Sequence, residues 1–87
     1  MTVLIAYDVA SDRRRTKISR ILAEYGERIQ YSVFECQLNQ DGLDAVRKRL
    51  AAVANARRDR VHFYPVCKAC FGRAETIGPA YENTLDY

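Results

Sequence analysis

The amino-acid sequence predicts a single small domain in which a β-sheet packs against two amphipathic helices. The chain has 87 residues, and single domains typically run to about 100–150 residues. Hydrophobic residues make up 48% of the sequence, and this content, regularly patterned, argues against a disordered chain. Along the chain, apolar positions alternate between the two-residue spacing of strands and the 3.6-residue spacing of helices.

The first strand and the first helix are predicted between residues 2 and 26. Residues 2–9 are almost continuously apolar, which is typical of a central strand covered on both faces. Ser11 or Asp12 is expected to cap the helix that follows, and Gly26 to end it. Its sheet-facing stripe is predicted to consist of Ile18, Ile21, Leu22 and Tyr25.

Residues 28–38, "RIQYSVFECQL", form the next predicted β segment because they are rich in β-branched and aromatic side chains. No glycine or proline marks a hairpin within them, so two architectures remain open. One continuous strand would give a small parallel sheet. Two antiparallel strands would give a ferredoxin-like split β-α-β sheet, with a bulge or tight corner near residues 31–34.

A second helix and a last strand complete the predicted domain. Asp41 is expected to cap a helix that ends near Asn55 and buries Leu43, Val46, Leu50 and Val53. Residues 60–67 read as a strand, and Pro65 within them predicts an edge or a bulge because proline donates no ladder hydrogen bond. Residues 71–77 are expected to form a further short strand, ahead of a polar tail.

Positive charge is clustered, although the formal net charge is only +3. The clusters lie within residues 13–20, 47–49 and 57–60. Local basic clusters suit a phosphate backbone; the alternative interpretation is solvated helix faces and a charged loop.

The sequence also argues against several classes of protein. No segment approaches the roughly 18–20 apolar residues of a membrane span, and no secretory leader is visible, so we expect a cytoplasmic protein. A structural zinc site needs about four ligands, whereas Cys67 and Cys70 form a single pair. Cys36 and His62 would complete a set only if the fold brought them together. We therefore expect reduced thiols in a reducing compartment.

Four motifs resemble a known family. They are "YDV" at residues 7–9, "SDRRRTK" at 11–17, "YGERIQYSVFEC" at 25–36 and "HFYPVCKAC" at 62–70. Together they resemble the Cas-two family of CRISPR-associated proteins, the second core adaptation protein and partner of the CRISPR integrase. The likeness runs from the first strand to about Ile77, and "RIQYSVFEC" is its most specific part.

The resemblance implies an α+β, ferredoxin-like β-α-β-β-α-β fold over residues 1–78. It further implies a homodimer with the two sheets packed together, and a tail, residues 79–87, that adds an extra strand to the partner protomer's sheet. It implies partnership with integrase dimers during spacer acquisition. Some family members are described as metal-dependent endonucleases on RNA or DNA.

Asp8 is the candidate catalytic residue and metal ligand. Cleaving a phosphodiester requires an activated water and neutralised phosphate oxygens, and Mg²⁺ supplies both. One Asp per chain is too little to hold such a site, but a two-fold axis past the end of the first strand would bring two copies together. The resemblance implies this ligand role for Asp8. Its alternative role is a turn acid interacting with the dipole of the following helix.

Arginines and aromatic residues complete the candidate site. Arg14 lies on the sheet-facing stripe in the first helical turn, a geometry expected to point its guanidinium toward Asp8. Arginine forks suit bidentate phosphate contact; the alternative for each basic residue is a surface charge. The resemblance implies that Arg15, Lys17 and Arg28 contact nucleic acid, and Arg14 joins them as a candidate nucleic-acid-binding residue. The resemblance also implicates Tyr7 and Phe34, either by stacking on a base or by packing in the dimer core.

Two functions fit these features. The first is a magnesium-dependent endonuclease acting on single-stranded RNA or double-stranded DNA, with Asp8 from each protomer as ligand. The second is a non-catalytic DNA-binding scaffold that joins two integrase dimers across a spacer precursor. One protein can combine both, and we expect the bridging role together with endonuclease activity. A toxin-like ribonuclease of related fold is a third hypothesis.

Overall fold

The computed structural model describes residues 1–67, 69, 72, 73, 75, 77 and 78. Its elements are β1 (Thr2–Asp8), α1 (Asp12–Ala23), β2 (Gly26–Gln30), β3 (Val33–Gln37), α2 (Gln40–Val53) and β4 (Arg60–Val66). Within the described residues the strands form one sheet in the order β2-β3-β1-β4, and every neighbouring pair is antiparallel. The ferredoxin-like α+β order is thus confirmed, and the small parallel sheet is wrong.

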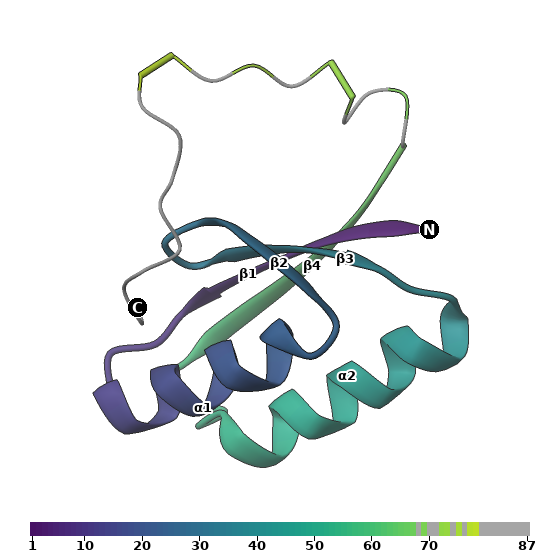
Figure 1. Cartoon of the computed structure of the whole chain (residues 1–87). Helices are drawn as coiled ribbons and strands as arrows, with labels where there is room; N and C mark the ends of the chain where they lie inside the picture. Colours follow the sequence, from purple (N-terminus) through teal and green to yellow (C-terminus); the bar gives the residue numbers. More distant parts are fainter. Residues whose placement is uncertain (68, 70–71, 74, 76, 79–87) are drawn as a thin grey trace.

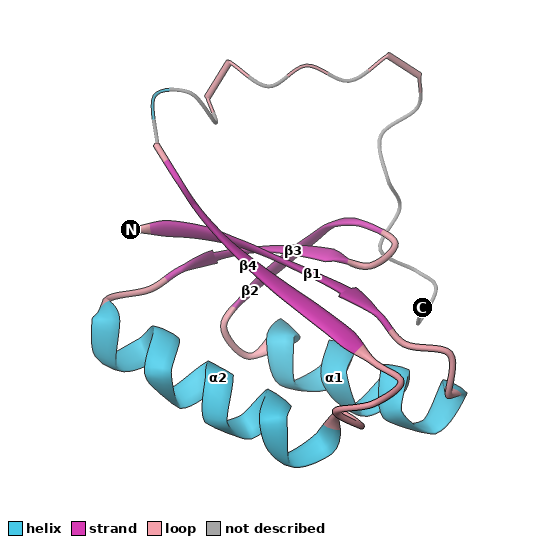
Figure 2. Cartoon of the chain, turned by 180° about the vertical axis from the view of Figure 1, so that it is seen from behind, coloured by secondary structure: helices cyan, strands magenta, loops and turns pink. Residues whose placement is uncertain are grey.

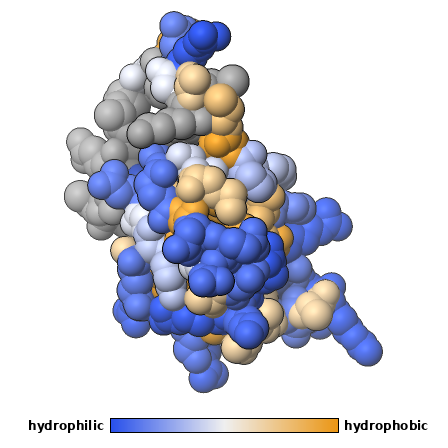
Figure 3. Space-filling view, turned by 90° about the vertical axis from the view of Figure 1, so that its right-hand side faces the viewer, coloured by the Kyte–Doolittle hydropathy of each residue, from blue (hydrophilic) through white to orange (hydrophobic). Residues whose placement is uncertain are grey.

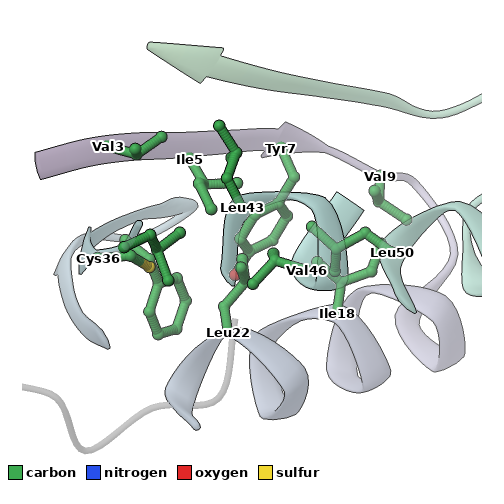
Figure 4. Packing of buried hydrophobic residues seen from close by; sticks show 12 residues of the cluster. Val3, Ile5, Tyr7, Val9, Ile18, Leu22, Cys36, Leu43, Val46 and Leu50 are labelled. Carbon is green, nitrogen blue, oxygen red and sulfur yellow. The ribbon is translucent and has the colours of Figure 1, made fainter. Parts of the chain in front are cut away.

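Both helices lie on the same face of the sheet (Figures 1 and 2). Alternation along β1 turns Val3, Ile5 and Tyr7 toward the helices, since successive strand side chains point to opposite faces. Figure 4 shows these side chains against residues from both helices. The helical residues most deeply buried in this core are Ile18, Leu22, Val46 and Leu50. Both predicted helical stripes therefore face the sheet, with Ile21, Tyr25 and Val53 packed at the core's margin.

Asparagine and serine, rather than aspartate, cap the helices. The side chain of Ser11 accepts a hydrogen bond from the Arg14 backbone N at 3.3 Å, so Ser11 is the N-cap of α1. The prediction of Asp41 as the cap of α2 is wrong, because Asn39 Oδ1 accepts from the Gly42 N at 2.7 Å. α2 begins one residue before Asp41, which places that carboxylate in the first turn.

Residues 28–38 do not form one strand. β2 and β3 make a hairpin whose turn contains Tyr31 and Ser32, and the register between them shifts at Arg28/Gln30. The turn therefore supplies the bend that no glycine or proline marks, within the residues 31–34 where a corner was expected, whereas the bulge lies before it, between Arg28 and Gln30. Tyr31 in the turn is 53% exposed.

Gly26 is the first residue of β2 rather than the end of α1. The helix stops at Ala23, with Glu24 as its C-cap. A Cβ atom built on Gly26 would lie 2.0 Å from the Glu35 carbonyl oxygen and 2.8 Å from the Cα of Cys36. The residue is glycine because the backbone of β3 approaches it closely, and not because it terminates a helix.

β4 is an edge strand, as the proline predicted: Pro65 lies within it, opposite Val3 of β1. The described residues between 69 and 78 contain no strand. The prediction for residues 71–77 falls partly outside the described residues, and that for the tail, 79–87, entirely outside them. Of the helices in the described part, neither is long and apolar enough to cross a membrane.

We predict that Gly26→Ala destabilises the domain, because the new methyl group would collide with the β3 backbone. Overpacking of this kind costs about 1–3 kcal/mol. Gly42→Ala is the matched control, since its Cβ would approach only the Asn39 and Leu38 side chains, at 3.2 and 3.3 Å. Urea unfolding of both variants measures the effect. Equal stability of Gly26→Ala and wild type would show that β2 does not lie this close to β3.

Candidate nucleic-acid and metal site at the end of strand β1

The face of the sheet that points away from the helices carries the candidate site. In β1 this face is formed by Leu4, Ala6 and Asp8, which alternate with the core residues. Figure 3 shows hydrophilic atoms over the lower, helical part of the molecule and apolar atoms reaching the surface above it. The neighbouring strands add Val33, Glu35, Gln37, Arg60, His62, Tyr64 and Val66 to this open face. It combines apolar, aromatic and charged side chains.

Asp8 is the last residue of β1 and is exposed. It lies directly opposite Arg60 of β4 in the antiparallel register, where facing side chains are near neighbours. Within the described residues the Asp8 carboxylate forms no hydrogen bond and no ion pair. It is therefore an accessible acid beside a cation, at the carboxyl end of the central strand.

Arg15 holds the connection that follows Asp8. Its NH1 group donates to the carbonyl oxygens of Val9 and Ala10, at 3.0 and 3.3 Å. Its NH2 group pairs with Asp12. The candidate nucleic-acid-binding residue Arg15 thus fixes the backbone between β1 and α1, where it shapes the surroundings of Asp8.

Arg14 does not turn toward Asp8, which corrects the expectation from helical spacing. Its guanidinium forms two bonds with Asp59, from Nε to Oδ2 at 2.7 Å and from NH2 to Oδ1 at 3.0 Å. The Asp59 side chain is completely enclosed, whereas that of Arg14 is 28% exposed. The hydrogen bonds from Arg14 lower the pKa of the Asp59 carboxyl, although burial opposes the shift.

Asp59 also organises the loop between α2 and β4. Its Oδ2 accepts from the Asn55 backbone N at 2.7 Å. The Asn55 Oδ1 in turn accepts from the backbone N of Arg57 and Arg58, at 3.0 and 3.2 Å. Sequence reasoning missed Asp59. The available signal was one acid inside the basic run "RRDR".

The remaining candidates divide between surface and core. Lys17 is exposed on α1. Tyr7 and Phe34 are 3% and 2% exposed, and their rings stack with centroids 6.4 Å apart. This burial places both aromatics in the core of the single chain, so neither presents a face to a base here. The Arg28 guanidinium lies 5.2 Å from the centroid of the Phe34 ring, on the helix side of the sheet.

The residues of one chain fit a magnesium ion only in part. Among the described residues, no three His, Cys, Asp or Glu side chains come together. Mg²⁺ prefers oxygen ligands and is commonly held by one or two carboxylates plus waters and substrate phosphates. Asp8 supplies one such oxygen ligand. A second copy of Asp8 would complete this donor set, whereas the sulfur and imidazole ligands of a zinc site are not gathered in the described part.

The cysteines that the structure describes differ in environment. Cys36 is completely buried, and burial raises the pKa of its thiol to about 11. Cys67 is exposed. Cys70, which follows three positions later in the sequence, falls outside the described residues. The buried Cys36 is a packing residue of the core.

The geometry defines a small ferredoxin-like domain with an accessible carboxylate on an open sheet face and basic residues around one end. Residues 1–74 match the sequence profile of the family described as CRISPR associated protein Cas2. The chain belongs to the Cas2 family of CRISPR-associated proteins.

Individual relatives agree with this membership. A Rhodospirillum rubrum protein named CRISPR-associated endoribonuclease Cas2 4 is 37% identical over 82 residues, which cover 94% of this chain and 66% of that protein. The chain thus spans about two thirds of that relative's length. The crystal structure of Streptococcus pyogenes Cas2 at pH 6.5 superimposes with a TM-score of 0.82 at 31% identity, over 90% of this chain and 100% of that one.

A further similar structure comes from an assembly. A chain of a partial Cas6-RT-Cas1–Cas2 complex has a TM-score of 0.70 and 27% identity, and covers 87% of this chain and 89% of its own length. The same fold is thus present in a protein assembled with Cas1.

The Arg14–Asp59 pair predicts a particular loss of stability in acid. Because the folded-state pKa of Asp59 is lowered, the stability that the ionised carboxylate adds is fully present above its unfolded-state pKa of about 3.9. It is lost as the pH falls through the lowered folded-state value. The difference in unfolding free energy between wild type and Asp59→Asn should therefore be constant near neutral pH and shrink below about pH 4. Urea titrations over this range measure it, and a difference that stays constant in acid would contradict the assignment.

Proposed function

We propose that this chain acts as a homodimer in CRISPR spacer acquisition, where it binds nucleic acid and bridges Cas1 integrase dimers, and that it is also a magnesium-dependent endonuclease. Membership of the Cas2 family and the likeness to a chain assembled with Cas1 support the adaptation role. The name of the Rhodospirillum rubrum relative supports the endonuclease role.

The observation that carries the proposal is the exposed Asp8 on the open face of the sheet. The two helices α1 and α2 lie on the other face. Leu4 and Ala6 are partly exposed beside the 51% exposed Tyr64, and a surface of this kind gains free energy when it is covered. Packing two such faces about a two-fold axis would cover both apolar surfaces with one self-complementary contact.

The same packing would bring two Asp8 carboxylates toward each other. Like charges at close range repel unless a cation or a proton lies between them. The pair would therefore form an oxygen-ligand site for Mg²⁺, which when bound activates water and neutralises phosphate charge. The residues of this chain then have distinct tasks: Asp8 binds the cation, Arg15 fixes the backbone behind Asp8, and the exposed basic residues hold the phosphate backbone.

A non-catalytic scaffold is the second candidate function. The exposed positive charges of the α1 and 57–60 clusters favour it, because phosphate contacts alone supply non-specific affinity for a duplex. The two functions differ in what they require of Asp8. Cleavage needs the carboxylate, whereas bridging two integrase dimers needs the fold and the basic residues.

We predict that Asp8→Asn abolishes intrinsic cleavage but keeps the fold. Loss of even an outer-shell partner of a metal ligand commonly costs 10–100-fold in activity, so loss of the ligand itself should cost at least about 100-fold. Stability should change by no more than about 0.5 kcal/mol, since only an exposed charge is lost. The measurement is cleavage of RNA and of duplex DNA, with and without Mg²⁺, by protein whose dimeric state is checked by light scattering.

Glu35→Gln is the control, because it removes another carboxylate from the same sheet face. We expect it to cleave as wild type does. Undiminished cleavage by a folded Asp8→Asn dimer would contradict the nuclease proposal. Spacer integration retained by Asp8→Asn would assign the biological role to the scaffold.

A further inference from the structure

The Arg14–Asp59 ion pair joins two basic clusters that lie far apart in the sequence. Arg14 is in the first turn of α1, close to the exposed Arg13 and Lys17. Asp59 lies 45 positions further along the chain, in the loop between α2 and β4. Figures 1 and 2 both show this loop beside the beginning of α1.

The pair fixes orientation as well as position. A planar guanidinium that donates two bonds to one carboxylate holds both groups in a defined geometry. The same Asp59 carboxylate accepts from the Asn55 backbone, and Asn55 accepts from the backbones of Arg57 and Arg58. Helix α1 is thereby connected to the backbone that carries the second cluster by an unbroken series of hydrogen bonds.

We propose that Arg14 and Asp59 form a clasp that holds loop 55–59 against α1, so that the exposed Arg57 and Arg58 and the exposed Arg13 and Lys17 make one phosphate-binding surface. In this arrangement Arg14 is a positioning residue and not itself a phosphate contact, because Asp59 occupies its fork. The inference rests on the proposed binding of nucleic acid, and it assigns to Asp59 a part in that binding.

The clasp and simple electrostatics predict opposite changes in DNA affinity when Asp59 is replaced by asparagine. Asp59→Asn removes one negative charge from a basic region. If only the field of the protein mattered, a DNA duplex would bind this variant more tightly. The clasp predicts weaker binding, because an asparagine amide presents an NH2 group to one arm of the Arg14 fork and loosens the loop. The sign of the change therefore distinguishes the two explanations.

Glu24→Gln provides a matched control. Glu24 also accepts two bonds from an arginine, from NH1 and NH2 of Arg49, each at 3.0 Å. The substitution raises the net charge by the same amount and disrupts the same type of pair. Glu24 lies at the opposite end of α1 from Arg14, so this pair does not hold the loop.

The experiment is fluorescence anisotropy of a labelled DNA duplex titrated with full-length wild type and variants between about 50 and 300 mM salt. We expect Asp59→Asn to bind about 5- to 30-fold more weakly near 150 mM salt, with a log–log salt slope smaller by about one to two, because one or two phosphate contacts are lost. Glu24→Gln should bind as wild type does or more tightly, with an unchanged slope.

The binding results can contradict the clasp alone or the clasp together with the proposed function. Circular dichroism first checks that Asp59→Asn is folded. If the folded variant then binds DNA at least as tightly as wild type, with the same salt slope, the clasp is overturned but the proposed function is not. A wild type that shows no salt-dependent binding would overturn the proposed function as well. If Asp59→Asn does not fold, Arg14→Lys replaces it, because lysine keeps the charge but cannot make the fork. A wild-type salt slope in that variant would likewise overturn the clasp.

Discussion

The burial of one face of β1 is the constraint on which the rest of the structure depends. Val3, Ile5 and Tyr7 are each at most 3% exposed beneath the helices, and the two-residue period of a strand then places Leu4, Ala6 and Asp8 on the opposite face. A register slip of one residue would exchange these two sets. The hydrophobic effect acting on apolar side chains thus determines where the single acid of β1 is presented.

The charged residues around the end of β1 have different roles. Of the arginines that begin α1, two bind within the chain: Arg14 pairs with Asp59 and Arg15 with the carbonyls that follow β1. Their contribution is to fix backbone geometry next to Asp8 and beneath the 57–60 cluster. Exposed neighbours such as Arg13 and Lys17 remain for external phosphates. A run of like charges can therefore contain residues with different physical roles.

The sequence predicted much of the fold, because the strand and helix periods are local properties. Both helical stripes and the edge position of Pro65 were predicted correctly. The choice between one strand and a hairpin in residues 28–38 was not available from the residues alone, since Tyr31 and Ser32 are not strong turn formers. Gly26 was misassigned because its requirement is a close approach of β3, a tertiary contact.

The candidate site was predicted less completely than the fold, because it too depends on tertiary contacts. Asp8 could be placed at a strand end by counting along one strand. The partner of Arg14 could not, because the contact spans 45 positions and helical spacing specifies only a direction. The aromatic pair Tyr7–Phe34 was assigned either to a base or to the dimer core, but its partners are the helices of its own chain. The residue pattern within one helix or strand shows on which face a side chain lies. Only the packing of helices and strands shows which residues that side chain contacts.

In the proposed dimer, the Asp8 residues of two copies share one cation. Electron paramagnetic resonance of Mn²⁺, used in place of Mg²⁺, tests it most directly by counting tightly bound ions against protein concentration. We expect one such ion for every two wild-type chains, and none in Asp8→Asn. One tight site in each chain, or a tight site that persists in Asp8→Asn, would contradict it.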